Sequence, residues 1–150
     1  MRERKGGQVI PVLAVALLVM VAAIGLAVDG GFVYYWGTRT ETAAIAGAAA
    51  GARHLPDFAT AASDAEGAVK LNGLAPTSKP SIDRRPIPEC PSGPGAGDVS
   101  VCVSDVPAGA TPEKLRVTVT RRFSLFFLQV VGAGPTIVVS RTAERANPNG

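Results

Sequence analysis

The sequence predicts an α+β fold in which one long N-terminal helix precedes a small domain with an antiparallel sheet. An uncharged apolar run covers Val9–Val28, and an alanine-rich segment without proline covers 29–53. Nearer the C-terminus, three segments alternate β-branched and polar residues. The first two patterns are typical of helices, and the third is typical of strands that bury one face.

The apolar run Val9–Val28 is long enough to cross a bilayer. At about 1.5 Å per residue, a helix of this length spans roughly 30 Å, the thickness of the hydrocarbon core. The run holds no charged, amide or hydroxyl side chain, and Pro11 falls in the first turn, where its missing N–H breaks no helical hydrogen bond. We therefore predict a transmembrane helix over 9–28.

The charges beside this run predict its orientation. Three basic residues precede it, Arg2, Arg4 and Lys5. Only Glu3 opposes them, and no basic residue follows the run before Arg39. Since the positive flank stays inside, we expect a cytoplasmic leader over 1–8, one pass through the cytoplasmic (inner) membrane, and an exported remainder. The rival interpretation is a signal peptide cleaved after Ala27, although the run exceeds the roughly 7–15 apolar residues usual there.

The alanine-rich segment 29–53 is predicted to prolong the helix into a stalk, and the sequence leaves open whether the helix bends at Gly30-Gly31. Small residues recur along the helix at four-residue spacing: Ala23, Ala27, Gly31, Ala43, Gly47 and Gly51. Such spacing lets helices approach closely and favours assembly with copies of this chain or with related subunits. The alternative is a chance spacing in an alanine-rich sequence.

Aromatic residues gather where the helix is expected to leave the membrane: Phe32, Tyr34, Tyr35 and Trp36. Because rings with a polar edge favour the headgroup layer, we interpret them as a membrane-interface belt. The alternative places them in the core of the exported domain. Asp29, at the membrane exit, is expected to be solvated by water, and the alternative is a pair with a basic group of a neighbouring subunit.

The exported domain, 54–145, is predicted to begin with a helix over 57–71. Asp57 suits the N-cap, and Asn72-Gly73 suits the C-terminal end. A proline-rich loop over 75–97 follows, with at most a short edge strand near 82–87.

Three strands are predicted in the rest of the domain, over 98–106, 114–120 and 136–142. The first two are expected to form an antiparallel hairpin through the turn 107–113. The tail 146–150 is expected to be disordered.

The segment 124–131, SLFFLQVV, fits either a further strand or a short helix. Phe123, Phe126 and Phe127 hold most of the aromatic area of the exported domain, so we expect them to cover one face of the sheet. The alternative is an exposed docking surface for a partner.

Cys90 and Cys102 lie in the part assigned to the exported side, where disulfides form. The even count favours a bridge between them, which would stabilise the fold by about 3 kcal/mol in the chain-entropy model. Two free thiols are the alternative.

The sequence offers no candidate catalytic residue, metal ligand or cofactor site. The single histidine, His54, has no carboxylate or cysteine next to it in sequence, and no glycine-rich phosphate loop follows a predicted strand. The net charge of +3 leaves no clustered basic face for nucleic acid. We therefore expect a protein that is not an enzyme, binds no small-molecule substrate and has the lipid bilayer as a partner.

Several short motifs follow one another in a characteristic order. Gly7-Gln8 precedes the apolar run, Ala27-Val28-Asp29-Gly30-Gly31 closes it, and an alanine-rich helix ends near Arg53. Leu115-Arg116-Val117-Thr118-Val119, Phe126-Phe127, Gly132 and a last strand ending near Ala143 complete the order. This order resembles the TadE/TadG-like family of tight-adherence (Flp-type) pilus systems. The resemblance implies a pilin-like, membrane-anchored subunit whose partners are other pilin-like or pilus-assembly proteins of the inner membrane.

One departure from pilin precursors is plain. Precursors cut by a prepilin peptidase carry glutamate five residues after the glycine at the cut, but here that residue is Val12 counted from Gly7, or Pro11 counted from Gly6. We expect no such cleavage, which favours a membrane-retained role over a main filament subunit. The alternative function is an anchored, exported binding module that contacts a ligand or surface target through its loops.

Overall fold

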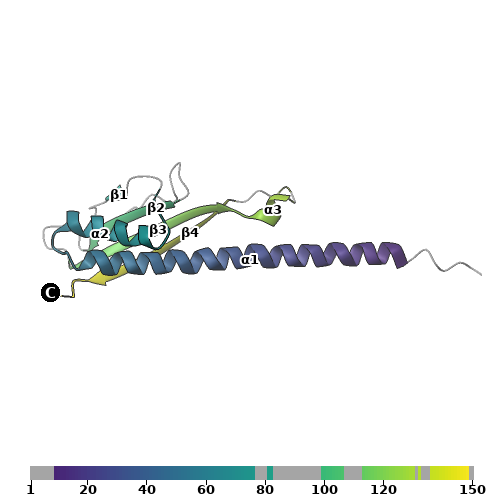
Figure 1. Ribbon diagram of the computed structural model, residues 1–150, viewed down its shortest axis with the longest axis horizontal. Coiled ribbons are helices and arrows are strands. Elements are labelled where there is room, and N and C mark those ends of the chain that lie inside the picture. The colour runs from purple at the N-terminus through teal and green to yellow at the C-terminus, as the bar shows by residue number, and fades with distance from the viewer. Residues whose placement is uncertain are drawn as a thin grey trace, which may run out of the picture.

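The computed structural model describes residues 9–76, 81–82, 99–106, 113–130, 132 and 136–148. Its elements in chain order are α1 (Val9–Ala52), α2 (Phe58–Leu71), β1 (Ser81–Ile82), β2 (Val99–Val106), β3 (Lys114–Ser124), α3 (Phe126–Val130) and β4 (Thr136–Ala146). Figure 1 shows α1 as one continuous rod along the molecule, with the other elements gathered over part of its length. The α+β class and the long apolar N-terminal helix are confirmed.

The strands form one sheet in the order β1-β2-β3-β4. β2 pairs with β3 and β3 with β4 in antiparallel fashion, whereas β1 pairs with β2 in parallel. The predicted antiparallel pairing of the first two long strands is therefore confirmed, although most of the turn between them lies outside the described residues. β3 and β4 run further than predicted, to Ser124 and Ala146, because they stay paired up to the match of Ser124 with Thr136 and of Lys114 with Ala146.

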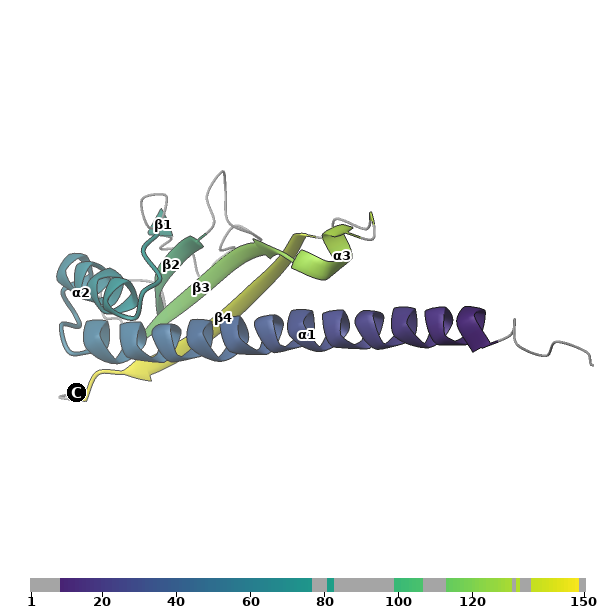
Figure 2. The ribbon, with the colours of Figure 1, turned by 45° about the vertical axis from the view of Figure 1, so that its right-hand side comes forward.

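The core lies between the sheet and the second half of α1, with α2 packed beside both (Figure 2). Val101 and Val103 of β2 and Val117 of β3 alternate with polar residues along their strands, and all three are fully buried in one cluster that also contains alanines of α1, such as Ala44 and Ala48. Alanine suits this position because its small side chain lets the helix lie close to the sheet. The segment predicted as a stalk, 29–53, continues α1 to Ala52 and also forms the spine of the domain.

Three residues of the small-residue series face inward within this chain. Ala43, Gly47 and Gly51 are buried. A Cβ added to Gly47 would lie 3.0 Å from Val69 Cγ2 of α2, and one added to Gly51 would clash with Leu115 of β3. Gly47 and Gly51 are therefore covered by α2 and β3, and Ala43 is buried, so in this chain these three positions are closed to the helix of another subunit.

The predicted ends of α2 are confirmed. Asp57 is the N-cap, since its carboxylate accepts hydrogen bonds from the N–H groups of Ala59 and Thr60, at 3.2 and 3.4 Å. The helix gives way at Asn72, and Gly73 adopts a φ of +77°, a left-handed conformation that glycine accepts without strain.

The predicted disorder of the tail is wrong for its first residues. Ala146 belongs to β4, and Asn147 donates from Nδ2 to the Leu55 carbonyl at 2.9 Å and from its N–H to the Glu113 carbonyl at 3.1 Å. The end of β4 is thus tied to the turn between α1 and α2. Residues 149–150 lie outside the described residues.

Candidate membrane interface

The N-terminal half of α1 is largely uncovered by the rest of the described chain, apart from α3 near the end of that half. Every large apolar side chain from Val9 to Val28 is between 54% and 74% exposed. Figure 1 shows this half extending past the sheet and α2. Among the described residues, α1 is the one helix long and apolar enough to cross a membrane. The exposed apolar surface is compatible with a single-pass membrane anchor.

The short helix α3 lies against α1 at the end of this exposed half (Figures 1 and 2). Asp29 holds it there. Oδ1 of Asp29 accepts hydrogen bonds from the N–H groups of Phe126 and Phe127, at 3.1 and 3.2 Å. Oδ2 accepts from those of Phe127 and Leu128, at 3.2 and 3.1 Å. These N–H groups belong to the first turn of α3, where a helix has no internal acceptors for them.

Asp29 is therefore not the water-solvated carboxylate that we predicted, because the residue is only 4% exposed. Its partners are backbone donors of the same chain rather than a basic group of a neighbouring subunit. Hydrogen bonds from N–H groups to a carboxylate are stronger than bonds between neutral groups, and the N-terminal end of a helix favours a negative charge. One acidic side chain on α1 thus fixes the position of a segment almost 100 residues away.

Gly25 completes the seat for α3. It lies four residues before Asp29 on the same face of α1, and the ring of Phe127 packs directly on its backbone. A side chain at position 25 would overlap that ring. Gly25 and Asp29 together form what we call the α3 seat.

A shallow groove of about 300 Å³ runs between α1 and α3 at this point, with an almost wholly apolar lining. Its lining residues are Val21, Ile24, Gly25, Val28, Phe126 and Phe127. The side chain of Phe126 is 76% exposed. The prediction that Phe126 and Phe127 cover a face of the sheet is wrong, because both belong to α3. Within the segment 124–131, Phe126–Val130 form a short helix, and Ser124 is the last residue of β3.

The aromatic residues that follow Asp29 were predicted to form a membrane-interface belt, with a place in the core as the alternative. The structure places some of them in the core and leaves others exposed. Trp36 packs against the core, and the guanidinium carbon of Arg121 lies 3.3 Å from its ring centroid. Phe32 packs edge-on against Phe123 of β3, with their centroids 6.4 Å apart. Tyr34 projects into solvent. The cluster therefore belongs partly to the core, which was the alternative interpretation, and only its exposed members are free to serve as a membrane belt.

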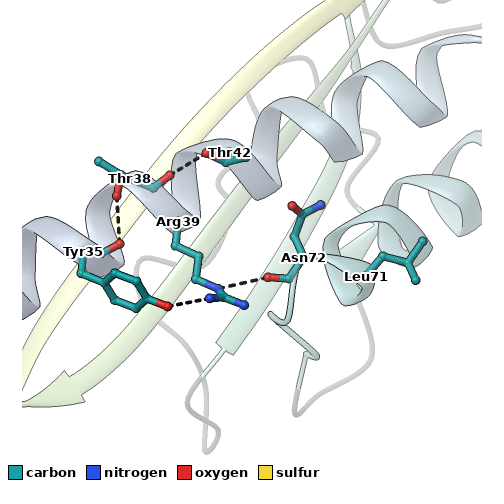
Figure 3. Close-up of a pocket in the computed structure, with 6 residues that line it drawn as sticks. All are labelled: Tyr35, Thr38, Arg39, Thr42, Leu71 and Asn72. Carbon is teal, nitrogen blue, oxygen red and sulfur yellow. Dashed lines mark hydrogen bonds between the residues drawn. The ribbon is translucent and has the colours of Figure 1, made fainter.

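A second, polar pocket of about 350 Å³ lies between α1 and the end of α2 (Figure 3). Arg39 spans it: Nη1 donates to the Tyr35 hydroxyl at 2.6 Å, and Nε donates to the Asn72 carbonyl at 3.2 Å. The remaining lining residues are Thr38, Thr42 and Leu71. None of the six is a carboxylate, histidine or cysteine, and the Tyr35 hydroxyl already accepts a hydrogen bond from Arg39. Arg39 acts here as a tie between the two helices.

The structure gives His54 a neighbour that its sequence position did not suggest. His54 lies in the turn before α2, and its Nε2 is 2.7 Å from Oδ2 of Asp64 on α2. Both side chains are more than two-fifths exposed, so the pair is a surface contact. Within the ranges that the structure describes, no three His, Cys, Asp or Glu side chains gather to hold a metal ion.

Cys102 is buried on β2. Cys90 lies outside the described residues, so its pairing with Cys102 stays a prediction.

Comparison with known proteins found no match to a family model, a curated protein or a solved structure. Function is therefore inferred from the sequence pattern and from the geometry of α1 and α3.

Proposed function

We propose that this chain is a non-enzymatic, membrane-anchored, pilin-like subunit of a tight-adherence (Flp) pilus or a related secretion machine. Its N-terminus lies in the cytoplasm, α1 crosses the inner membrane, and the domain stands outside. The observation that carries the proposal is the division of α1. Its first half exposes apolar side chains along its whole length, and its second half is the spine of the domain.

The continuity of α1 supports a role in which the anchor and the domain act as one body. The helix runs without interruption through Gly30-Gly31, where a bend was considered. Cleavage after Ala27 would remove Gly25, and with it the surface that receives Phe127. The α3 seat therefore favours a retained anchor over a signal peptide.

The exposed half of α1 also supplies a surface for assembly. Ala23, Ala27 and Gly31 are exposed, and a Cβ added to Gly31 would meet nothing within 4 Å. Unlike Ala43, Gly47 and Gly51, these three positions are free to receive another helix. Their four-residue spacing suits close packing in a bilayer, where small residues let helix backbones approach.

The experiment places a photo-crosslinking amino acid at Ala27 in the full chain, in the membranes of the producing cells. The matched control carries it at Leu71, which is 90% exposed on α2. We expect adducts to a second copy or to another inner-membrane protein from position 27 and few from position 71. Mass spectrometry of the membrane fraction should find the N-terminus intact. Recovery of the intact chain in the soluble fraction, or no protein adduct from position 27, would contradict the proposal. Adducts from position 71 alone would favour the binding-module alternative.

A further inference from the structure

The height of α3 along α1 can be compared with the thickness of a bilayer. Gly25 and Asp29 lie 16 to 20 residues beyond Val9, which corresponds to roughly 24–30 Å along the helix axis. A hydrocarbon core of about 30 Å that begins at Val9 therefore ends at the turn of α1 that carries α3. The α3 seat lies at the outer edge of the proposed span rather than in the water beyond it.

The groove between α1 and α3 is lined by the same kind of apolar side chain as the proposed span. Three of its lining residues, Val21, Ile24 and Val28, are span residues that are exposed to the same surroundings as the rest of the anchor. Phe126 forms the opposite wall and is exposed. The groove is thus continuous with a surface whose proposed neighbour is lipid, and its lining is almost entirely apolar.

Backbone groups enter the edge of a hydrocarbon layer only when their hydrogen bonds are made within the protein. The free donors at the start of α3 are those of Phe126, Phe127 and Leu128, and Asp29 accepts from all three. The same hydrogen bonds give the Asp29 carboxylate its partners, and the surrounding protein buries this residue away from solvent. α3 therefore presents the apolar side chain of Phe126 outward while these three N–H groups are paired.

We propose that α3 is a second membrane contact: Phe126 enters the outer leaflet beside α1, and a lipid acyl chain occupies the groove between them. The inference rests on the proposed anchoring by α1. With contacts at both α1 and α3, the tilt and the depth of the domain relative to the membrane surface are restrained. A single spanning helix would leave the tilt of the domain less restrained.

The test uses the full chain reconstituted in vesicles of phosphatidylcholine and phosphatidylglycerol, with phosphatidylcholine brominated on its acyl chains as the quencher. Trp36→Phe removes the only native tryptophan. Three variants on this background each carry one tryptophan: Phe126→Trp in α3, Leu17→Trp within the span, and Leu71→Trp on α2. Circular dichroism checks that each variant keeps its helix content.

We expect Phe126→Trp to be quenched to an extent comparable with Leu17→Trp, and Leu71→Trp to be quenched several-fold less. If Leu17→Trp is quenched and Phe126→Trp is not, the anchor stands and the inference about α3 is wrong. Shielding of Phe126→Trp from both brominated lipid and aqueous iodide would show that a protein surface covers it, which also overturns the inference. An unquenched Leu17→Trp would overturn the anchor and the second contact together.

Discussion

The ring of Phe127 lies where a side chain at position 25 would project, so α3 can dock on α1 only because Gly25 has no Cβ. This contact joins the edge of the proposed span to a five-residue helix near the end of the chain. The first two predictions concern the α3 seat, which Gly25 and Asp29 form.

Replacing Gly25 with alanine should release α3 from its seat while leaving the core intact. The added methyl group would overlap the Phe127 ring, and overpacking of this kind costs about 1–3 kcal/mol, a change of roughly 5–150-fold in the opening equilibrium. Hydrogen exchange of residues 126–130, measured by mass spectrometry on the full chain in micelles, should accelerate accordingly. Gly31→Ala is the matched control, since a Cβ there meets nothing within 4 Å. Equal protection in the two variants would show that α3 does not need Gly25.

Replacing Asp29 with asparagine should have a similar local effect for a different reason. The amide keeps the shape of the side chain, but one carboxylate oxygen is replaced by an NH₂ group, which cannot accept a hydrogen bond. In the parent chain, Oδ2 accepts from the N–H groups of Phe127 and Leu128, and an NH₂ group there would leave them without this acceptor. Each buried donor left without an acceptor costs about 1–3 kcal/mol. We expect faster amide exchange at Phe126, Phe127 and Leu128. Glu41→Gln, at an exposed position of the same helix, should leave their exchange unchanged.

Gly51→Ala should destabilise the whole domain. A Cβ there would clash with the side chain of Leu115 and the backbone carbonyl of Ala61, and a backbone atom cannot move aside cheaply. We expect a loss of about 1–3 kcal/mol in the free energy of unfolding. Thermal unfolding followed by circular dichroism in micelles measures it.

The control for that substitution is Gly67→Ala on α2, where a Cβ meets nothing within 4 Å. It should raise stability by about 0.5–1 kcal/mol, because alanine favours the helix over glycine. Equal effects of the two substitutions would contradict the tight packing at Gly51.

The N-cap of α2 should make stability depend on acid. The hydrogen bond donated by the Thr60 hydroxyl, helped by the N–H groups of Thr60 and Ala59, lowers the pKa of the Asp57 carboxyl below its ordinary value of 3.8. A carboxyl with a lowered pKa in the folded state stabilises the fold above its ordinary pKa, and that contribution is lost as the pH falls through the lowered value. The melting temperature of Asp57→Ala should therefore lie below that of the parent chain near neutral pH, and the gap should narrow below about pH 3.8. A gap that stays constant with pH would show that the charge on Asp57 is not involved.

The elements that sequence reasoning found correctly are those with local signals. Asp57 and Gly73 bound α2 through hydrogen bonds and backbone conformations that involve their immediate neighbours. The valines of β2 and β3 alternate with polar residues, and burial on one face follows directly from that alternation. The length of α1 follows from apolar and alanine-rich segments without an interior proline beyond the first turn.

The seat of α3 was missed because it depends on a contact across 97 residues of sequence. Nothing local distinguishes a carboxylate that caps a distant helix from one that is solvated by water. A usable signal was present in the spacing: Gly25 and Asp29 lie four residues apart, so one helix face offers both a bare backbone and an acceptor.

The four-residue spacing of small residues predicted that one face of the helix packs closely against something, but it did not predict which segment packs there. Gly47 and Gly51 pack within this chain, whereas Ala27 and Gly31 remain open, although all four fit the same pattern. The difference is set by where the domain ends along α1, which depends on the tertiary fold.

The packing of Leu115 against Gly51 has a consequence during synthesis. At translation rates of ~5–20 residues per second, β3 follows the end of α1 after roughly 3–13 seconds. Throughout that delay, the stripe of alanines and glycines on α1 lacks the cover that β3 later gives it. Slower synthesis would lengthen this period, so the yield of folded chain depends on how soon β3 follows α1.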